Sequence, residues 1–146
     1  MNQRFDVQRF AMLKGIGVDK VEAVQCETPS AEPMFDVNWL IKFSDGTILS
    51  LQFWRLIKDG KSPFSSFEHG RRYGLPAPID ALDRLREELQ GQTTTQVLLD
   101  RHTGDLLFDF AGGQRLEVFN FTGYEIWQLQ FPDGSAEYSN YVLMTE

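Results

Sequence analysis

Leu40-Ile41-Lys42-Phe43-Ser44-Asp45-Gly46-Thr47-Ile48-Leu49 is the stretch of sequence that decides the fold. Its apolar residues alternate with polar ones, as in a strand with one buried face, and Asp45-Gly46 is typical of a tight hairpin turn. Part of the stretch recurs sixty-seven positions later, where Leu40, Phe43, Gly46 and Leu49 are echoed by Leu107, Phe110, Gly113 and Leu116. Each half of the chain is therefore predicted to contain a pair of turn-linked strands.

The first hairpin has predicted neighbours on both sides. Its alternation runs from residue 37 to 43 and resumes from 49 to 53, and Asp59-Gly60 ends the unit. Residues 18–26 alternate well enough to predict a preceding strand. Val7, Phe10, Ala11 and Lys14 lie at helical spacing before Gly15, which predicts a short helix over 4–14.

The second half begins with a long connection over residues 61–77. A helix is predicted from Pro78 to Gly91, because Ile79, Leu82, Leu85 and Leu89 form one apolar stripe. Five short strands should follow, over residues 95–100, 106–110, 115–121, 124–131 and 138–144. Connections this short can join only antiparallel neighbours, so a meander is expected over 95–131.

These elements predict a single α+β domain spanning residues 1–146. Its antiparallel meander sheet should have about seven or eight strands, strongly twisted or partly closed, with two helices packed against it. Each half reads helix, strand, strand, strand. The echo leaves two explanations open, namely an αβββ duplication or independent use of the same turn chemistry.

Composition limits the classes of function. The chain has 146 residues, 42% of them hydrophobic, and a formal net charge of -7. This negative charge disfavours nucleic acid and anionic membranes and would attract a basic partner. No apolar run reaches the roughly 18 residues of a membrane span, and residues 1–13 lack the pattern of a signal peptide, so a cytoplasmic location is expected. Cys26 is the only cysteine and is expected to be a small buried side chain.

The connection over 61–77 holds the candidate loop site, whose members are hydroxyl, acidic, imidazole, guanidinium and phenol side chains: Ser65, Ser66, Glu68, His69, Arg71, Arg72 and Tyr73. In an enzyme, His69 would be a general base that activates a serine hydroxyl, with a carboxylate orienting its ring. No Gly-x-Ser-x-Gly elbow supports this reading. The favoured interpretation is a loop packed across the sheet, with His69 bonded to backbone and with three anchors, Phe67, Tyr73 and Leu75.

No metal or cofactor site is predicted. His69 and His102 would have to meet together with carboxylates, and their spacing matches no known ligand motif.

Three stretches carry a resemblance to a family: Ser65-Ser66-Phe67-Glu68-His69-Gly70 with Tyr73-Gly74-Leu75-Pro76-Ala77-Pro78-Ile79-Asp80-Ala81, Leu116-Glu117-Val118-Phe119-Asn120, and Gly123-Tyr124-Glu125-Ile126-Trp127. They resemble small bacterial cytosolic proteins of unknown function, some of which are similar to immunity proteins of toxin systems. The resemblance implies a bacterial source and a protein partner. It carries over no catalytic residue.

The predicted function is accordingly a non-catalytic protein-binding module that neutralises a basic partner through complementary charge. The candidate contacts are acidic side chains with tryptophan anchors if these are exposed: Glu68, Asp100, Asp105, Glu125, Trp54 and Trp127. The alternatives are a small-molecule-binding protein or hydrolase centred on His69, and a homodimer formed through an apolar sheet face.

Overall fold

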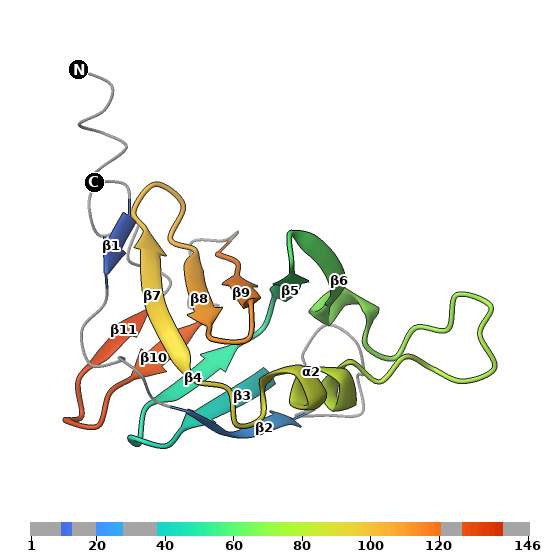
Figure 1. Cartoon of the computed structure of the whole chain (residues 1–146), viewed down its shortest axis with the longest axis horizontal. Helices are drawn as coiled ribbons and strands as arrows, with labels where there is room; N and C mark the ends of the chain where they lie inside the picture. Colours follow the sequence, from blue (N-terminus) through green and yellow to red (C-terminus); the bar gives the residue numbers. More distant parts are fainter. Residues whose placement is uncertain (1–9, 13–19, 28–37, 121–126, 139–146) are drawn as a thin grey trace.

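The computed structural model describes residues 10–12, 20–27, 38–120 and 127–138, which form two antiparallel sheets packed face to face (Figure 1). The larger sheet has six strands, in the spatial order β1 (Phe10–Met12), β7 (Thr94–Asp100), β8 (Leu106–Phe110), β9 (Gln114–Val118), β5 (Trp54–Lys58) and β6 (Lys61–Ser65). The smaller sheet has five, in the order β11 (Ala136–Tyr138), β10 (Gln128–Gln130), β4 (Ile48–Leu51), β3 (Asn38–Phe43) and β2 (Val21–Glu27). A 3₁₀ turn, η1 (Ser66–Glu68), and an α-helix, α2 (Ala81–Leu89), follow β6.

The prediction of one sheet with seven or eight strands is wrong, and its physical reason is the apolar content of both halves of the chain. A single sheet would leave one apolar face in water, whereas two sheets bury their apolar faces against each other. The chain changes sheet between β4 and β5, across only Gln52 and Phe53. Antiparallel pairing and the helix over α2 are confirmed, and the described residues are mostly β.

Two further predictions fail in particular segments. Residues 10–12 of the predicted N-terminal helix form a strand that pairs with residues 98–100 of β7, and the rest of that helix lies outside the described residues. The meander over 95–131 is confirmed for β7, β8 and β9, but β10 pairs with β4 and β11 in the other sheet. The predicted strand over 138–144 falls almost wholly outside the described residues.

The two echoed motifs form equivalent turns. Gly46 N–H donates to the Phe43 carbonyl at 3.0 Å, and Gly113 N–H donates to the Phe110 carbonyl at 3.1 Å. Both glycines have a left-handed φ, of 98° and 90°, which only glycine adopts without strain. A third turn, Phe131 to Gly134, has the same bond and a φ of 91°. The motif therefore follows from turn chemistry, and the duplication stays a prediction.

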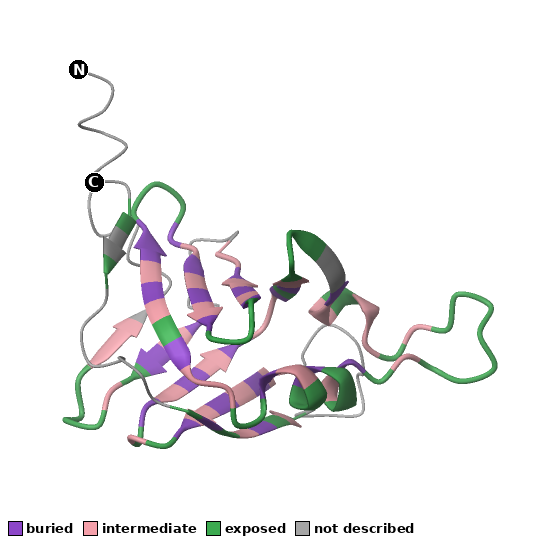
Figure 2. Cartoon of the chain, viewed as in Figure 1, coloured by how far each residue is buried: buried purple, intermediate pink, exposed green. Residues whose placement is uncertain are grey.

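The core lies between the sheets, where every second residue of β3, β4, β8 and β9 is buried (Figure 2). Aromatic pairs join the two sheets. The rings of Trp39 and Trp54 meet edge to face with centroids 5.0 Å apart, and Phe43 stacks on Phe108 at 5.8 Å. Each such side chain contributes about 1.5–3 kcal/mol by burial, so these pairs hold the sheets together.

Helix α2 protects one edge of the smaller sheet. Its apolar stripe is buried, with Ala81, Leu85 and Leu89 inaccessible to solvent. Beside this stripe, Arg86 Nε donates to the Val24 carbonyl of edge strand β2 at 2.8 Å. A covered carbonyl cannot pair with a strand from another molecule, so α2 blocks edge-to-edge association there.

The connection over 61–77 is more ordered than predicted. Asp59 and Gly60 both have positive φ, of 54° and 78°, as in the type I′ turn that joins paired strands. They link β5 to β6, so residues 61–65 belong to the larger sheet.

No helix in the described part of the chain is both long and apolar enough to cross a membrane.

Candidate functional site

A slender hairpin projects from the body of the molecule between η1 and α2 (Figure 1). It comprises residues 70–79, and we call it the Tyr73 hairpin. At its base, Gly70 N–H donates to the Ile79 carbonyl and Ile79 N–H donates to the Arg71 carbonyl, both at 2.8 Å. These two backbone bonds close the base and fix where the tip points.

The tip of the hairpin is a tight turn. Leu75 N–H donates to the Arg72 carbonyl at 2.7 Å, and the two residues between them, Tyr73 and Gly74, have φ values of 45° and 80°. Two successive positive φ values define a type I′ turn. Glycine adopts this conformation freely, but a bulky L-residue such as tyrosine does so at a cost of about 1–2 kcal/mol. Tyr73 is therefore held in a strained backbone conformation.

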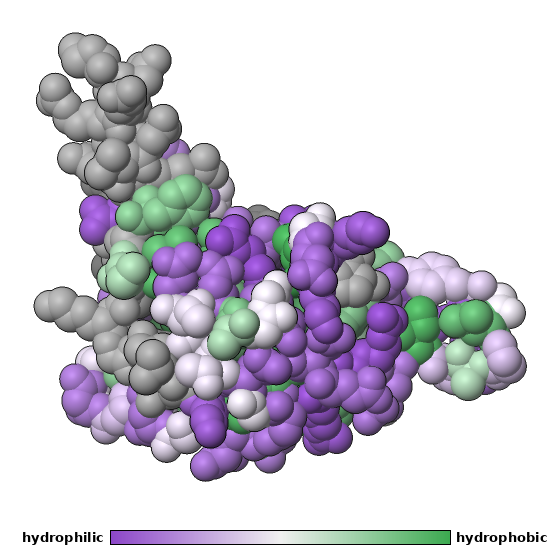
Figure 3. Space-filling model, viewed as in Figure 1, coloured by the Kyte–Doolittle hydropathy of each residue, from purple (hydrophilic) through white to green (hydrophobic). Residues whose placement is uncertain are grey.

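The hairpin and its base expose apolar side chains. Tyr73 is 61% exposed, Leu75 is 49% exposed, and Phe67 in η1 is 61% exposed. Arg71 covers part of Phe67, since its guanidinium lies 3.8 Å from the ring centroid and its Nε donates to the Phe67 carbonyl at 2.7 Å. Figure 3 shows hydrophobic residues, in green, among paler ones on this projection, next to a largely hydrophilic face of the sandwich. The prediction that Phe67, Tyr73 and Leu75 anchor the loop on the sheet is wrong.

His69 anchors the hairpin to the helix. Its Nδ1 accepts a hydrogen bond from Ala81 N–H at 3.0 Å, and its ring meets Trp39 edge to face at 5.1 Å. This bond satisfies a backbone donor of the first turn of α2, while Asp80 satisfies another by accepting from Asp83 N–H at 2.9 Å. The prediction that His69 is bonded to backbone is confirmed.

The neighbouring polar residues of the candidate loop site also bond to backbone. Glu68 Oε1 accepts from Ser65 N–H at 3.0 Å in a capping box around η1. Ser66 Oγ accepts from Trp54 N–H at 3.0 Å and thereby ties η1 to β5. These side chains are committed to the local fold, whereas Arg72 and Tyr73 point into solvent at the hairpin tip.

Two of the predicted partner contacts belong to the core. Trp54 and Trp127 are both buried, so the exposure on which their prediction as surface anchors depended is not met. Trp127 Nε1 donates to the Gly104 carbonyl at 2.7 Å and so fixes the turn between β7 and β8. Glu125 lies outside the described residues.

The other two acidic candidates hold the same turn. Asp100 is only 5% exposed, and its Oδ1 accepts from His102 N–H at 2.9 Å, so it offers little surface to a partner. Asp105 is half-buried and accepts from Asn120 N–H at 2.7 Å. The Asp100 carboxylate therefore serves the β7–β8 turn itself, and the Asp105 carboxylate ties the end of that turn to the segment after β9.

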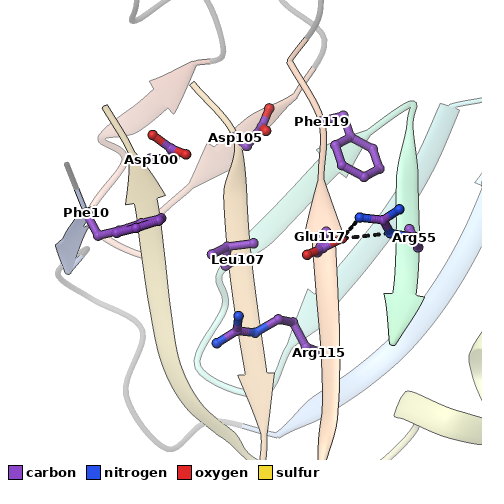
Figure 4. Close-up of a pocket in the computed structure, with 8 residues that line it drawn as sticks. All are labelled: Phe10, Arg55, Asp100, Asp105, Leu107, Arg115, Glu117 and Phe119. Carbon is purple, nitrogen blue, oxygen red and sulfur yellow. Dashed lines mark hydrogen bonds and ion pairs between the residues drawn. The ribbon is translucent and has the colours of Figure 1, made fainter. Parts of the chain in front are cut away.

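Both carboxylates lie at one end of a concavity of about 340 Å³ on the outer face of the larger sheet (Figure 4). It is lined by charged and apolar residues: Phe10, Arg55, Asp100, Asp105, Leu107, Arg115, Glu117 and Phe119. Arg55 donates through Nε to Glu117 at 2.7 Å, and Arg115 donates through Nε to Asp109 at 2.6 Å. Each guanidinium is thus neutralised by a carboxylate of a neighbouring strand.

The second ion pair changes the ionisation of its acid. The hydrogen bonds from Arg115 lower the pKa of Asp109 below its usual value, and a further bond from Gln96 acts in the same direction. Burial of the carboxylate opposes this shift. Asp109 is therefore held ionised, as a structural partner of Arg115.

The described residues contain no group of three or more His, Cys, Asp or Glu side chains suited to a metal ion.

Comparison of the chain with protein-family models, with curated proteins and with solved structures finds no match.

Proposed function

We propose that this chain is a non-catalytic protein-binding module of the immunity type, and that the Tyr73 hairpin is its binding element. The observation that carries the proposal is the projection of Tyr73, Leu75 and Arg72 on a hairpin closed at both its base and its tip. Tyrosine and arginine are enriched among the residues that dominate the energy of protein interfaces. Exposed apolar side chains that gather on a projection mark an interaction site more often than scattered ones do.

Preorganisation of the hairpin favours binding. A flexible loop loses about 0.5–1.5 kcal/mol for each side chain that it immobilises on association, and it loses backbone freedom as well. Three backbone hydrogen bonds already restrict the Tyr73 hairpin in the free protein. Pro76 and Pro78, on the segment that returns to α2, fix two further φ angles. The tip can therefore be presented without a large loss of entropy.

The charge of the chain supports a basic partner. Its formal net charge is -7, and Asp83 and Glu87 are exposed on α2, which begins where the hairpin ends. A field of this sign raises the rate of encounter with a basic protein.

The environment of His69 supports a non-catalytic role. Nδ1 of His69 is the ring nitrogen that carries no proton, and it already accepts the Ala81 N–H bond. It is therefore not free to take a proton from a nucleophile. A homodimer through an apolar sheet face also receives little support, because the apolar faces of the two sheets pack on each other.

The experiment is affinity capture from a lysate of the native cell at low salt, followed by purification of the retained protein and calorimetric titration. We expect the wild-type chain to bind a basic protein that the Tyr73→Ser/Leu75→Ser variant does not bind. Met12→Ser is the matched control, since Met12 is an exposed apolar residue on β1, at the opposite edge of the larger sheet. The proposal fails if no specific partner is retained, or if the hairpin variant and the control bind equally.

Sedimentation velocity of the wild-type chain at high micromolar concentration tests self-association separately. We expect a monomer, and a dimer that the hairpin variant abolishes would show that the hairpin binds a second copy instead.

A further inference from the structure

We infer that the Tyr73 hairpin enters a cleft in its partner, where Arg72 pairs with a carboxylate, while the acidic face of α2 meets a basic rim around that cleft. This inference rests on the proposed function and adds to it the chemistry of the partner.

The first argument is the separation of charge along the projection. Residues 69–79 contain Arg71 and Arg72 and no acidic residue, although the chain as a whole is strongly acidic. Arg71 is held at the base by its contacts with the ring and carbonyl of Phe67, so Arg72 is the exposed cation nearest the tip. The exposed carboxylates of Asp83 and Glu87 follow one turn apart on α2. The two exposed arginines of this helix are both engaged within the molecule, since the Arg84 guanidinium lies over the Phe64 ring and Arg86 donates to the Val24 carbonyl. A complementary surface is thus negative where it meets the tip and positive where it meets the helix.

The second argument is shape. A hairpin of two chain segments that ends in a type I′ turn is narrow and convex, so a flat surface would touch only its end. The exposed side chains of Tyr73 and Leu75 can both be buried only in a recess. In such a recess a guanidinium is stripped of water, and it binds a carboxylate through two parallel hydrogen bonds.

Together these requirements describe a class of protein. A protein that is basic at its surface and has carboxylates in a cleft is typical of an enzyme that acts on a polyanion, where the carboxylates hold a divalent cation or transfer protons. The hairpin would place the Arg72 guanidinium where the enzyme otherwise holds a divalent cation or a proton. The chain would then block that enzyme by occupying its catalytic cleft.

The test measures association and dissociation rates with the purified captured partner. A buried charge pair acts mainly on the dissociation rate, whereas rim charges act on the association rate and on its dependence on salt. We expect Arg72→Met to raise the dissociation rate about 30-fold or more, with Arg72→Lys intermediate, because lysine keeps the charge but not the paired hydrogen bonds. We expect Asp83→Asn/Glu87→Gln to slow association at low salt and to leave dissociation nearly unchanged.

Tyr73→Asn separates the aromatic contact from the turn. Asparagine tolerates the positive φ of this position, so the variant should keep the type I′ turn and the stability of wild type while it loses the ring. We expect it to bind at least tenfold more weakly, with an unfolding midpoint in urea equal to or above that of wild type. A fall in stability would show that the ring supports the fold, and it would overturn this assignment.

The outcomes separate the two proposals. Retention of no specific partner by wild type removes both. A partner that binds Arg72→Glu as tightly as wild type leaves the proposed function standing and removes the inference. A cleft carboxylate of the partner that, replaced by lysine, restores binding of Arg72→Glu supports the pair directly. Flotation with vesicles of phosphatidylglycerol and phosphatidylcholine, if Tyr73→Ser abolished it, would assign the hairpin to a lipid surface and overturn the inference.

Discussion

Replacement of His69 tests whether this side chain anchors the Tyr73 hairpin. Its Nδ1 accepts from Ala81 N–H at 3.0 Å, and its ring lies 5.1 Å from that of Trp39. Loss of a side chain that satisfies a donor in the first turn of a helix costs about 1 kcal/mol. Loss of an edge-to-face aromatic contact costs about 0.5–1.5 kcal/mol. His69→Ala removes both, so we expect the free energy of unfolding to fall by about 2 kcal/mol.

Two conservative variants divide this loss between its causes. His69→Phe keeps a ring against Trp39 but removes the acceptor, and His69→Asn keeps an acceptor near the position of Nδ1 but removes the ring. Each should lose about 1 kcal/mol. Because a domain of this size loses roughly 2 kcal/mol per molar urea, the midpoint should fall by about 1 M for the alanine variant and by about half of that for the other two.

The assay is equilibrium unfolding in urea followed by tryptophan fluorescence, for which Trp39 is a reporter beside the substituted ring. Amide exchange at Ala81 gives a local measurement, and it should quicken in the alanine and phenylalanine variants only. If all four proteins unfold at the same urea concentration, the assignment of His69 as an anchor is refuted. If His69→Phe alone matches wild type, the ring packing is confirmed and the hydrogen bond contributes nothing.

Three further predictions concern the sandwich. Asp109→Asn should cost about 0.2–1 kcal/mol at pH 7, as is usual for partly exposed ion pairs. Because the pKa of Asp109 is lowered by Arg115, this stabilisation is present above the unfolded-state pKa and is lost as the pH falls through the folded-state pKa; urea titrations should therefore show the gap at pH 7 and a smaller one at pH 3. Trp127→Phe should cost about 1–3 kcal/mol in thermal unfolding, since it leaves a buried carbonyl of the β7–β8 turn without its donor. Gly60→Val should cost about 1–2 kcal/mol, because its φ of 78° disfavours a side chain, whereas Asp59→Asn at a φ of 54° should be neutral.

Local features of the fold could be predicted from the sequence because they depend on few residues. The turn at Gly46 follows from Asp45-Gly46, and the stripe of Leu85 and Leu89 identifies α2. Pairing between distant segments leaves no such signal. β5 pairs with β9, about sixty residues away, and the two-residue step at Gln52 and Phe53 gives no sign that the chain changes sheet there. A hydrophobic pattern shows that a face is buried, but it does not show against what.

The candidate site divides in the same way. The backbone role of His69 could be expected, because a loop histidine with no convergent partners usually bonds to its surroundings. The projection of Tyr73 and Leu75 was missed, because large apolar side chains in a loop suggest anchors as readily as they suggest contacts. A signal was nevertheless present. Tyr73-Gly74 occupies the place of the Asn-Gly pair typical of type I′ turns, with an unusual first residue.

The conformation of Tyr73 links stability to function. A positive φ at a tyrosine costs about 1–2 kcal/mol, and a ring that is 61% exposed gains little from packing in the isolated chain. Asparagine or glycine would hold the same turn with less strain, so folding alone does not account for a tyrosine at this position. Strain that the fold itself does not offset is expected where a side chain is kept for contact with another molecule. The backbone at the tip therefore supports the same proposal as the exposed surface, because both are expected of a residue whose favourable interactions would form in a complex.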